Sequence, residues 1–227
     1  MKGWTAAALL LAALAAAPSA AATNECRGLN PCVKVAGPWV VVPAQRSIPR
    51  PQAQFQLTCP RGFVVAGVDA ELSDQAIDLA FLGASGTPVS PGVTTSRSLV
   101  FVGSYAGDRP RAPTFRPHVG CVPASGGGSR TPTAVRAVTP PGHPVTRRVV
   151  TERVRGEATA DVACRADERL VGWYASRGFA TPAPPAPALV ASLFTKATVR
   201  GNAVSVLARA GRGQGIVQLG ALCAGGR

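Results

Sequence analysis

The sequence predicts an all-β protein built from two tandem, disulfide-closed domains of the β-sandwich or barrel type. Short apolar runs alternate with turns along the chain, whose 227 residues include 25 Gly and 21 Pro, as is usual in these folds. Four of the six cysteines recur at matching intervals in the two halves. The chain is 46% hydrophobic and only 15% charged, a composition that excludes a disordered protein.

The first 22 residues are predicted to be a secretory signal peptide. Lys2 supplies a positive start, residues 6–17 are apolar, and residues 18–22 (PSAAA) end in the small side chains that signal peptidase needs. We therefore expect cleavage before Thr23. The apolar run is shorter than the roughly 20 residues of a membrane span, and no later stretch is long and apolar enough to form one. The mature chain is expected outside the cell or in the cell envelope.

An internal repeat predicts how the cysteines pair. An even number of cysteines in an oxidising compartment favours disulfides, but six cysteines allow 15 pairings. Cys59 and Cys121 are 62 residues apart, Cys164 and Cys223 are 59 apart, and the first cysteine of each pair precedes a glycine by eight residues. If each copy folds alone, Cys59 bonds Cys121 and Cys164 bonds Cys223. Closing each loop is expected to contribute about 4 kcal/mol of stability.

The repeat also sets the expected domain boundaries. The first β-domain covers 23–124, a Gly/Ser-rich linker covers 125–132, and the second β-domain covers 133–227. Cys26 and Cys32 then remain to close a small N-terminal loop. A zinc site is not expected, because no Cys-x-x-Cys pair is present and the chain has only two histidines.

The expected strands follow the apolar runs in chain order. In the first copy they are 54–59, 63–68, 99–102 and 119–122, with 80–82 as a candidate fifth. In the second copy they are 160–164, 169–174, 189–198, 203–208 and 216–223. The stretch 72–82 has partly helical spacing, but its counterpart 182–187 is rich in proline. Both stretches are therefore expected to be loops.

The sequence that begins at Cys59 resembles a known group of proteins. The run at 59–67 (CPRGFVVAG) and the apolar strand ending in cysteine at 222–224 (LCA) resemble the Cys-Pro-x-Gly repeats of secreted actinobacterial proteins, most of them uncharacterised. The resemblance covers about two thirds of the mature chain, and the second copy departs from it with the run CRAD at 164–167. It implies a disulfide-closed β-domain at or outside the cell surface, and it transfers no catalytic residue.

Four of the eleven acidic residues lie in one ten-residue run. They are Asp69, Glu71, Asp74 and Asp78. Asp69 and Glu71 would share one face of a strand, and paired carboxylates perform glycoside hydrolysis. The same oxygens are also suited to a calcium ion. We favour a solvated polar face, because the second copy has Tyr174 and Ser176 at the matching positions.

Other catalytic arrangements find little support in the sequence. No serine lies in a Gly-x-Ser-x-Gly motif, and the only histidines available as a base are His118 and His143. The cysteines are expected to be in disulfides and so unavailable as nucleophiles. No enzymatic activity, cofactor or metal is therefore expected.

Basic residues exceed acidic ones, giving a net charge of +13, and most of the excess lies in the second half. A candidate polyanion-binding face there comprises Arg147, Arg148, Arg153 and Arg155. Such a face would attract an anionic cell-surface polymer or polysaccharide. Nucleic acid is not expected as a partner, because aromatic residues make up only 5% and none is interleaved with these arginines. A solvated edge strand protected by charge is the alternative.

These observations predict a secreted, non-enzymatic binding or structural protein of the cell envelope or extracellular space. Its basic second domain is the expected contact for anionic polymers. The alternative function is a secreted, glycan-directed hydrolase that uses Asp69 and Glu71.

Overall fold

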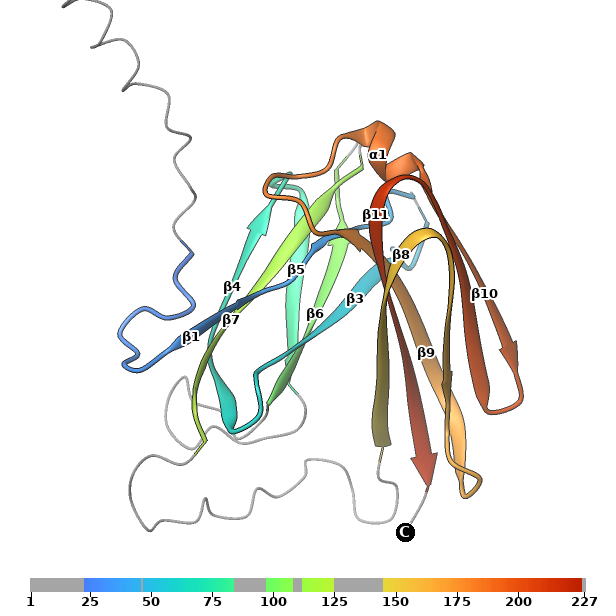
Figure 1. Ribbon diagram of the computed structural model, residues 1–227, viewed down its shortest axis with the longest axis horizontal. Helices are drawn as coiled ribbons and strands as arrows, with labels where there is room; N and C mark the ends of the chain where they lie inside the picture. Colours follow the sequence, from blue (N-terminus) through green and yellow to red (C-terminus); the bar gives the residue numbers. More distant parts are fainter. Residues whose placement is uncertain (1–22, 46, 84–96, 108–111, 125–144, 226–227) are drawn as a thin grey trace, which may run out of the picture.

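The computed structural model describes residues 23–45, 47–83, 97–107, 112–124 and 145–225. The predicted signal peptide, the predicted linker and His143 lie outside these residues. In this part of the chain every strand pair is antiparallel, and one five-residue helix accompanies eleven strands, which confirms the all-β class (Figure 1). Within the described residues no helix has the length and apolar character needed to cross a membrane.

The first half of the chain forms two sheets around one core. Its strands are β1 (Val33–Ala36), β2 (Trp39–Val41), β3 (Gln52–Thr58), β4 (Phe63–Leu72), β5 (Ile77–Gly83), β6 (Ser98–Tyr105) and β7 (Thr114–Pro123). Strands β1, β2 and β4 pair with β7, and β3, β6 and β5 form the second sheet. Phe55, Phe101 and Phe115 are buried between them. Alternation in β3 places Phe55 inward and its glutamines outward.

The second half uses fewer and longer strands. They are β8 (Val145–Ala163), β9 (Glu168–Phe179), β10 (Leu193–Arg200) and β11 (Ala203–Gly225), with helix α1 (Pro187–Ala191) before β10. Strands β8 and β11 each arch over at the top of Figure 1. Gly156 and Gly213 have positive φ near these bends, where glycine carries no steric penalty. Both arms of each strand contribute to one buried cluster.

The two halves repeat the same pairing pattern around their long-loop disulfides. In the first half Val65 lies opposite Cys121 and Gly67 opposite Gly120, so Ala66 is skipped. In the second half Leu170 lies opposite Cys223 and Gly172 opposite Leu222, so Val171 is skipped. A β-bulge therefore precedes the equivalent glycine in both halves.

All three predicted disulfides are confirmed. Cys59 bonds Cys121 and Cys164 bonds Cys223, and the small N-terminal loop is closed by Cys26 and Cys32. Cys59 follows β3 and Cys121 lies in β7, so this bond joins the two sheets of the first half. The bond between Cys164 and Cys223 joins the end of β8 to β11.

Strand β2 joins the two halves into one eight-stranded sheet. Val40 lies opposite Phe115 of β7 on one side and opposite Gly178 of β9 on the other. A Cβ at Gly178 would lie 2.7 Å from the Trp39 carbonyl oxygen, so the close approach of β2 requires glycine there. Each half still has its own buried cluster.

Several expected elements differ from the structure: β1 and β2 were not predicted, β8 begins at Val145 rather than at 160, and the expected strands 203–208 and 216–223 are parts of β11. The stretch 72–82 is not a loop, because β4 continues to Leu72 and β5 begins at Ile77, leaving a turn between them. Asp74 stabilises that turn by accepting a hydrogen bond from the backbone of Ala76. The expected strand at 189–198 begins with the end of α1, a helix for which Pro187 supplies the favoured first residue.

Candidate functional site

The four acidic residues of the predicted cluster lie in three different elements. Asp69 and Glu71 share one face of β4, as alternation along the strand predicts. Asp74 lies in the turn after β4 and accepts a hydrogen bond from the Tyr105 hydroxyl at 3.2 Å. Asp78 lies in β5 and forms an ion pair with Arg50 in which both side chains are more than half exposed. Asp74 and Asp78 are therefore each in contact with another side chain of the first half of the chain.

The N-terminal segment, residues 23–25, covers the face of β4 that carries Asp69. The backbone N–H of Asn24 donates to Asp69 Oδ2 at 2.6 Å. The Glu25 carbonyl lies against Gly67 and Gly120, where an added Cβ would be 1.7 and 2.0 Å from its oxygen. These two glycines are paired across β4 and β7. Together they form a bare strip of sheet on which extended backbone can lie.

Glu25 is buried at the centre of this contact, with 2% of its surface exposed. Its Oε1 accepts a hydrogen bond from the Thr23 hydroxyl at 3.1 Å and lies 3.5 Å from Lys34 Nζ. Its Oε2 is buried without a hydrogen-bond partner. Glu25 is not among the residues singled out from the sequence, where its neighbour Cys26 is the only signal of an ordered environment.

His118 lies between two carboxylates. Its Nε2 is 2.8 Å from Glu71 Oε1, and its Nδ1 is 3.9 Å from Glu25 Oε1. Arg116 adds an ion pair to Glu71 at 3.6 Å. Glu71 is therefore engaged with two basic side chains of β7. This arrangement links the N-terminal segment, β4 and β7 through polar side chains.

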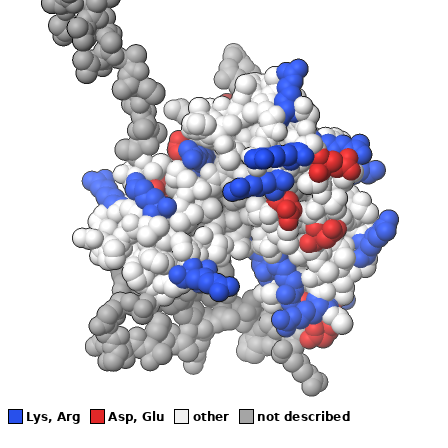
Figure 2. All heavy atoms as spheres, in the orientation of Figure 1, with Lys and Arg blue, Asp and Glu red and all other residues white. Residues whose placement is uncertain are grey.

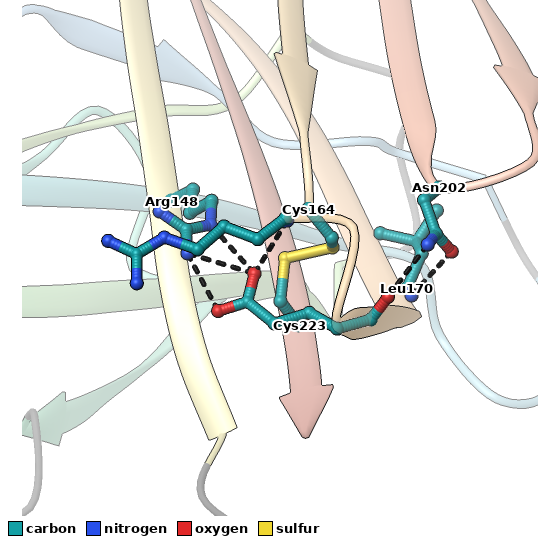
Figure 3. Close-up of a disulfide and its surroundings, with 7 residues drawn as sticks. Arg148, Cys164, Leu170, Asn202 and Cys223 are labelled. Atoms are coloured by element: carbon teal, nitrogen blue, oxygen red, sulfur yellow. Dashed lines mark hydrogen bonds and ion pairs between the residues drawn. A yellow bond between two sulfur atoms is a disulfide. The ribbon is translucent and has the colours of Figure 1, made fainter. Parts of the chain in front are cut away.

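Arg148 forms a compact network with Glu168 beside the second long-loop disulfide (Figure 3). Its guanidinium donates to both carboxylate oxygens at 2.7 to 3.1 Å, and the backbone N–H of Arg165 donates to the same group. The Arg148 hydrogen bonds, followed by the one from Arg165, lower the pKa of Glu168. Asn202 donates to the Glu168 carbonyl and accepts from the Leu170 N–H.

The same region contains the only group of three or more His, Cys, Asp or Glu side chains in the described residues whose ligand atoms all lie within 4.8 Å of one another. These are Cys164, Glu168 and Cys223. Because the two sulfurs are bonded to each other, neither is a thiolate able to bind a metal ion.

Arg147 contributes to the contact between the two halves of the chain. Its guanidinium lies over the Tyr174 ring, 5.1 Å from the centroid, and donates to Gln54 of β3 at 3.2 Å. Burial raises the pKa of Tyr174, and Arg147 partly opposes the change. The ring also packs on Gly220, where a Cβ would lie 2.0 Å from it.

Gln218 completes this contact with four hydrogen bonds. Its Oε1 accepts from the Gln56 backbone N–H at 2.6 Å and from the Tyr174 hydroxyl at 3.1 Å. Its Nε2 donates to the Gln56 carbonyl at 3.0 Å and to the Thr151 hydroxyl at 3.1 Å. Strand β3 is at the edge of its sheet, so the Gln218 amide takes the place of a neighbouring strand.

Two of the four arginines in the candidate polyanion-binding face are thus engaged inside the molecule. Arg147 and Arg148 leave opposite faces of β8. Arg153 and Arg155 are exposed, and Arg155 makes a long contact of 3.4 Å with Gln214. On the side of the molecule shown in Figure 2, basic residues are scattered over the surface and acidic residues lie among several of them.

The chain was compared with protein-family models, curated proteins and solved structures, and none of them matches. The fold and the contacts above define its class: an all-β protein of two joined units, stabilised by three disulfides.

Proposed function

We propose that this is a secreted, non-enzymatic binding or structural protein made of two copies of one disulfide-closed β-unit. The matching bulges and disulfides of the two halves support the duplication. The three disulfides are compatible with an oxidising, extracellular location. The observation that carries the proposal is the engagement of Asp69 by Asn24 and of Glu71 by His118 and Arg116. These contacts suit carboxylates with a structural role.

The proposed ligands are anionic polymers of the cell surface, contacted through Arg153 and Arg155. Both side chains belong to β8, lie in the exposed part of the strand and have no ion-pair partner in the described residues. Two such charges on a rigid strand attract a polyanion at long range, and salt weakens the attraction.

Heparin chromatography tests this proposal. The double variant Arg153→Gln/Arg155→Gln is expected to elute at lower salt than the wild-type protein, because two exposed charges are lost. The matched control is Arg27→Gln/Arg61→Gln, which removes the same charge from exposed positions in the first half. Equal shifts for the two double variants would indicate that only net charge matters and would contradict a site on β8.

The alternative function, glycan hydrolysis, is tested by activity. Wild-type protein is incubated with a panel of polysaccharides, and no turnover is expected. Turnover that disappears in both Asp69→Asn and Glu71→Gln would overturn the non-enzymatic proposal.

A further inference from the structure

A cavity of about 340 Å³ lies where the two halves of the chain meet. It is bounded by the end of β2 and the segment after it, the start of β3, the end of β9, α1 and the start of β10. Cavities of this size at the junction of two units are common binding places for small molecules.

Arg177 provides a positive charge at this cavity. Its Nη1 donates to the Leu193 carbonyl at 2.6 Å, and no carboxylate within the described ranges lies at ion-pair distance from it. Burial lowers the pKa of the guanidinium below its ordinary value. A partly buried cation without a counter-ion is costly, and an anionic ligand would offset that cost.

Ser176 provides a second polar group. The residue borders the same cavity and is buried, with 5% of its surface exposed, and its Oγ is buried without a hydrogen-bond partner. A buried hydroxyl in a protein normally has a partner, and rotation of the Ser176 side chain toward the cavity would let a ligand supply the one that this hydroxyl lacks. Successive side chains leave opposite faces of a strand, and the cavity lies at the β9 edge, where both Ser176 and Arg177 border it.

The backbone of β9 is open along the same edge. Its pairing with β2 covers only Gly178 and Phe179, so residues 175–177 have no described strand partner on that side. The rim of the cavity adds the polar side chains of Gln45, Gln52 and Thr195. The cavity is larger than a simple oxyanion needs, and its rim is suited to hydroxyl groups.

We propose that this cavity binds a small hydroxylated carboxylate, such as a monosaccharide acid. Arg177 pairs with the carboxylate, Ser176 donates a hydrogen bond to it after its side chain rotates toward the cavity, and the rim amides and hydroxyl contact the sugar hydroxyls. The site does not include Arg153 or Arg155. The test of this proposal is therefore independent of the test of polymer binding on β8.

Isothermal titration calorimetry with sodium glucuronate, at constant ionic strength, tests the site. Glucuronate is expected to bind at least about ten-fold more tightly than glucose, its neutral counterpart, because a charge-assisted contact with arginine is lost in glucose. Inorganic phosphate is expected to bind more weakly than glucuronate, because it cannot use the rim. Equal affinity of glucuronate with either glucose or phosphate would overturn the proposal.

Two variants locate the binding. Arg177→Gln is expected to weaken glucuronate binding by about ten-fold or more. Ser176→Ala removes a hydroxyl that has no partner in the protein, so it should fold normally, as circular dichroism would verify, yet bind glucuronate about three-fold more weakly. The control Arg153→Gln should bind it unchanged. Wild-type affinity in folded Ser176→Ala and Arg177→Gln would show that the ligand lies elsewhere and would also overturn the proposal.

Discussion

Glu168 is a buried carboxylate whose charge is balanced entirely by groups of its own half of the chain. Arg148 pairs with both of its oxygens, and the Arg165 N–H adds a further hydrogen bond. A carboxylate oxygen of Glu168 lies within 4.8 Å of the sulfurs of Cys164 and Cys223. These donors favour the ionised form, which is why the pKa of Glu168 is lowered in the folded protein.

A lowered pKa makes folding stability depend on pH. The contribution of Glu168 is complete above the ordinary pKa of glutamate in the unfolded chain, and it is lost as the pH falls through the lower folded value. We therefore expect the urea midpoint of the wild-type protein to decrease when the pH is lowered from 7 to 3. The decrease is expected to be smaller in Glu168→Gln. The control Glu152→Gln changes an exposed glutamate of β8 and should retain the wild-type pH dependence. Identical pH profiles for all three proteins would contradict a role for Glu168.

The N-terminal segment illustrates how one short element depends on glycines elsewhere in the chain. Residues 23–25 lie on the strip formed by Gly67 and Gly120, and Asp69 holds the segment through the Asn24 N–H. The Cys26–Cys32 disulfide follows directly and closes the adjoining loop. The N-terminal segment therefore covers the face of β4 that carries Asp69.

Substitution of Gly67 tests this arrangement. Gly67→Ala would place a Cβ 1.7 Å from the Glu25 carbonyl oxygen, so the N-terminal segment is expected to lift from the sheet. Hydrogen exchange of the Asn24 amide should then accelerate, because its bond to Asp69 is lost. The control Gly211→Ala, whose Cβ would lie 3.5 Å from its nearest neighbour, should leave that amide protected. Unchanged exchange in Gly67→Ala would contradict the proposed packing.

Two contacts determine how the halves of the whole molecule are joined. Strand β2 extends one sheet through both halves, and Gln218 holds the edge of β3. Arg147 and Tyr174 pack beside Gln218, across from Gln54 of the first half. All four hydrogen-bonding positions of the Gln218 amide are used, so this buried polar group incurs no unmet desolvation penalty.

Gln218→Met keeps the approximate volume and removes all four hydrogen bonds. It leaves the Gln56 backbone and the Tyr174 hydroxyl without these partners, so the free energy of unfolding is expected to fall by about 2–4 kcal/mol. Urea denaturation measures the change. The control is Gln75→Met, at an exposed position in a turn. It should lower the free energy of unfolding by less than about 0.5 kcal/mol. A loss for Gln218→Met no greater than that of the control would contradict the importance of this contact.

Local patterns predicted the three disulfides and parts of most strands, because alternation and cysteine spacing are properties of short or repeated segments. Strands β1 and β2 and the first part of β8 were not predicted. Strand β5 was missed because the proline-rich counterpart 182–187 in the second copy led to the expectation of a loop at 72–82, a stretch that itself contains no proline. Arg147 and Arg148 were expected at the surface, since nothing in their sequence neighbourhood indicates Tyr174 or Glu168 as partners.

The sequence by itself determined the all-β class and the three disulfides, because both follow from periodicities along the chain. Only the tertiary structure decided which charges are engaged and where a ligand has room. Glu25 and His118 are 93 positions apart along the chain, and Gln56 and Gln218 are separated by 162, so their contacts arise only when strands from distant segments pair. The cavity beside Arg177 has the same origin, since its walls come from both halves of the chain.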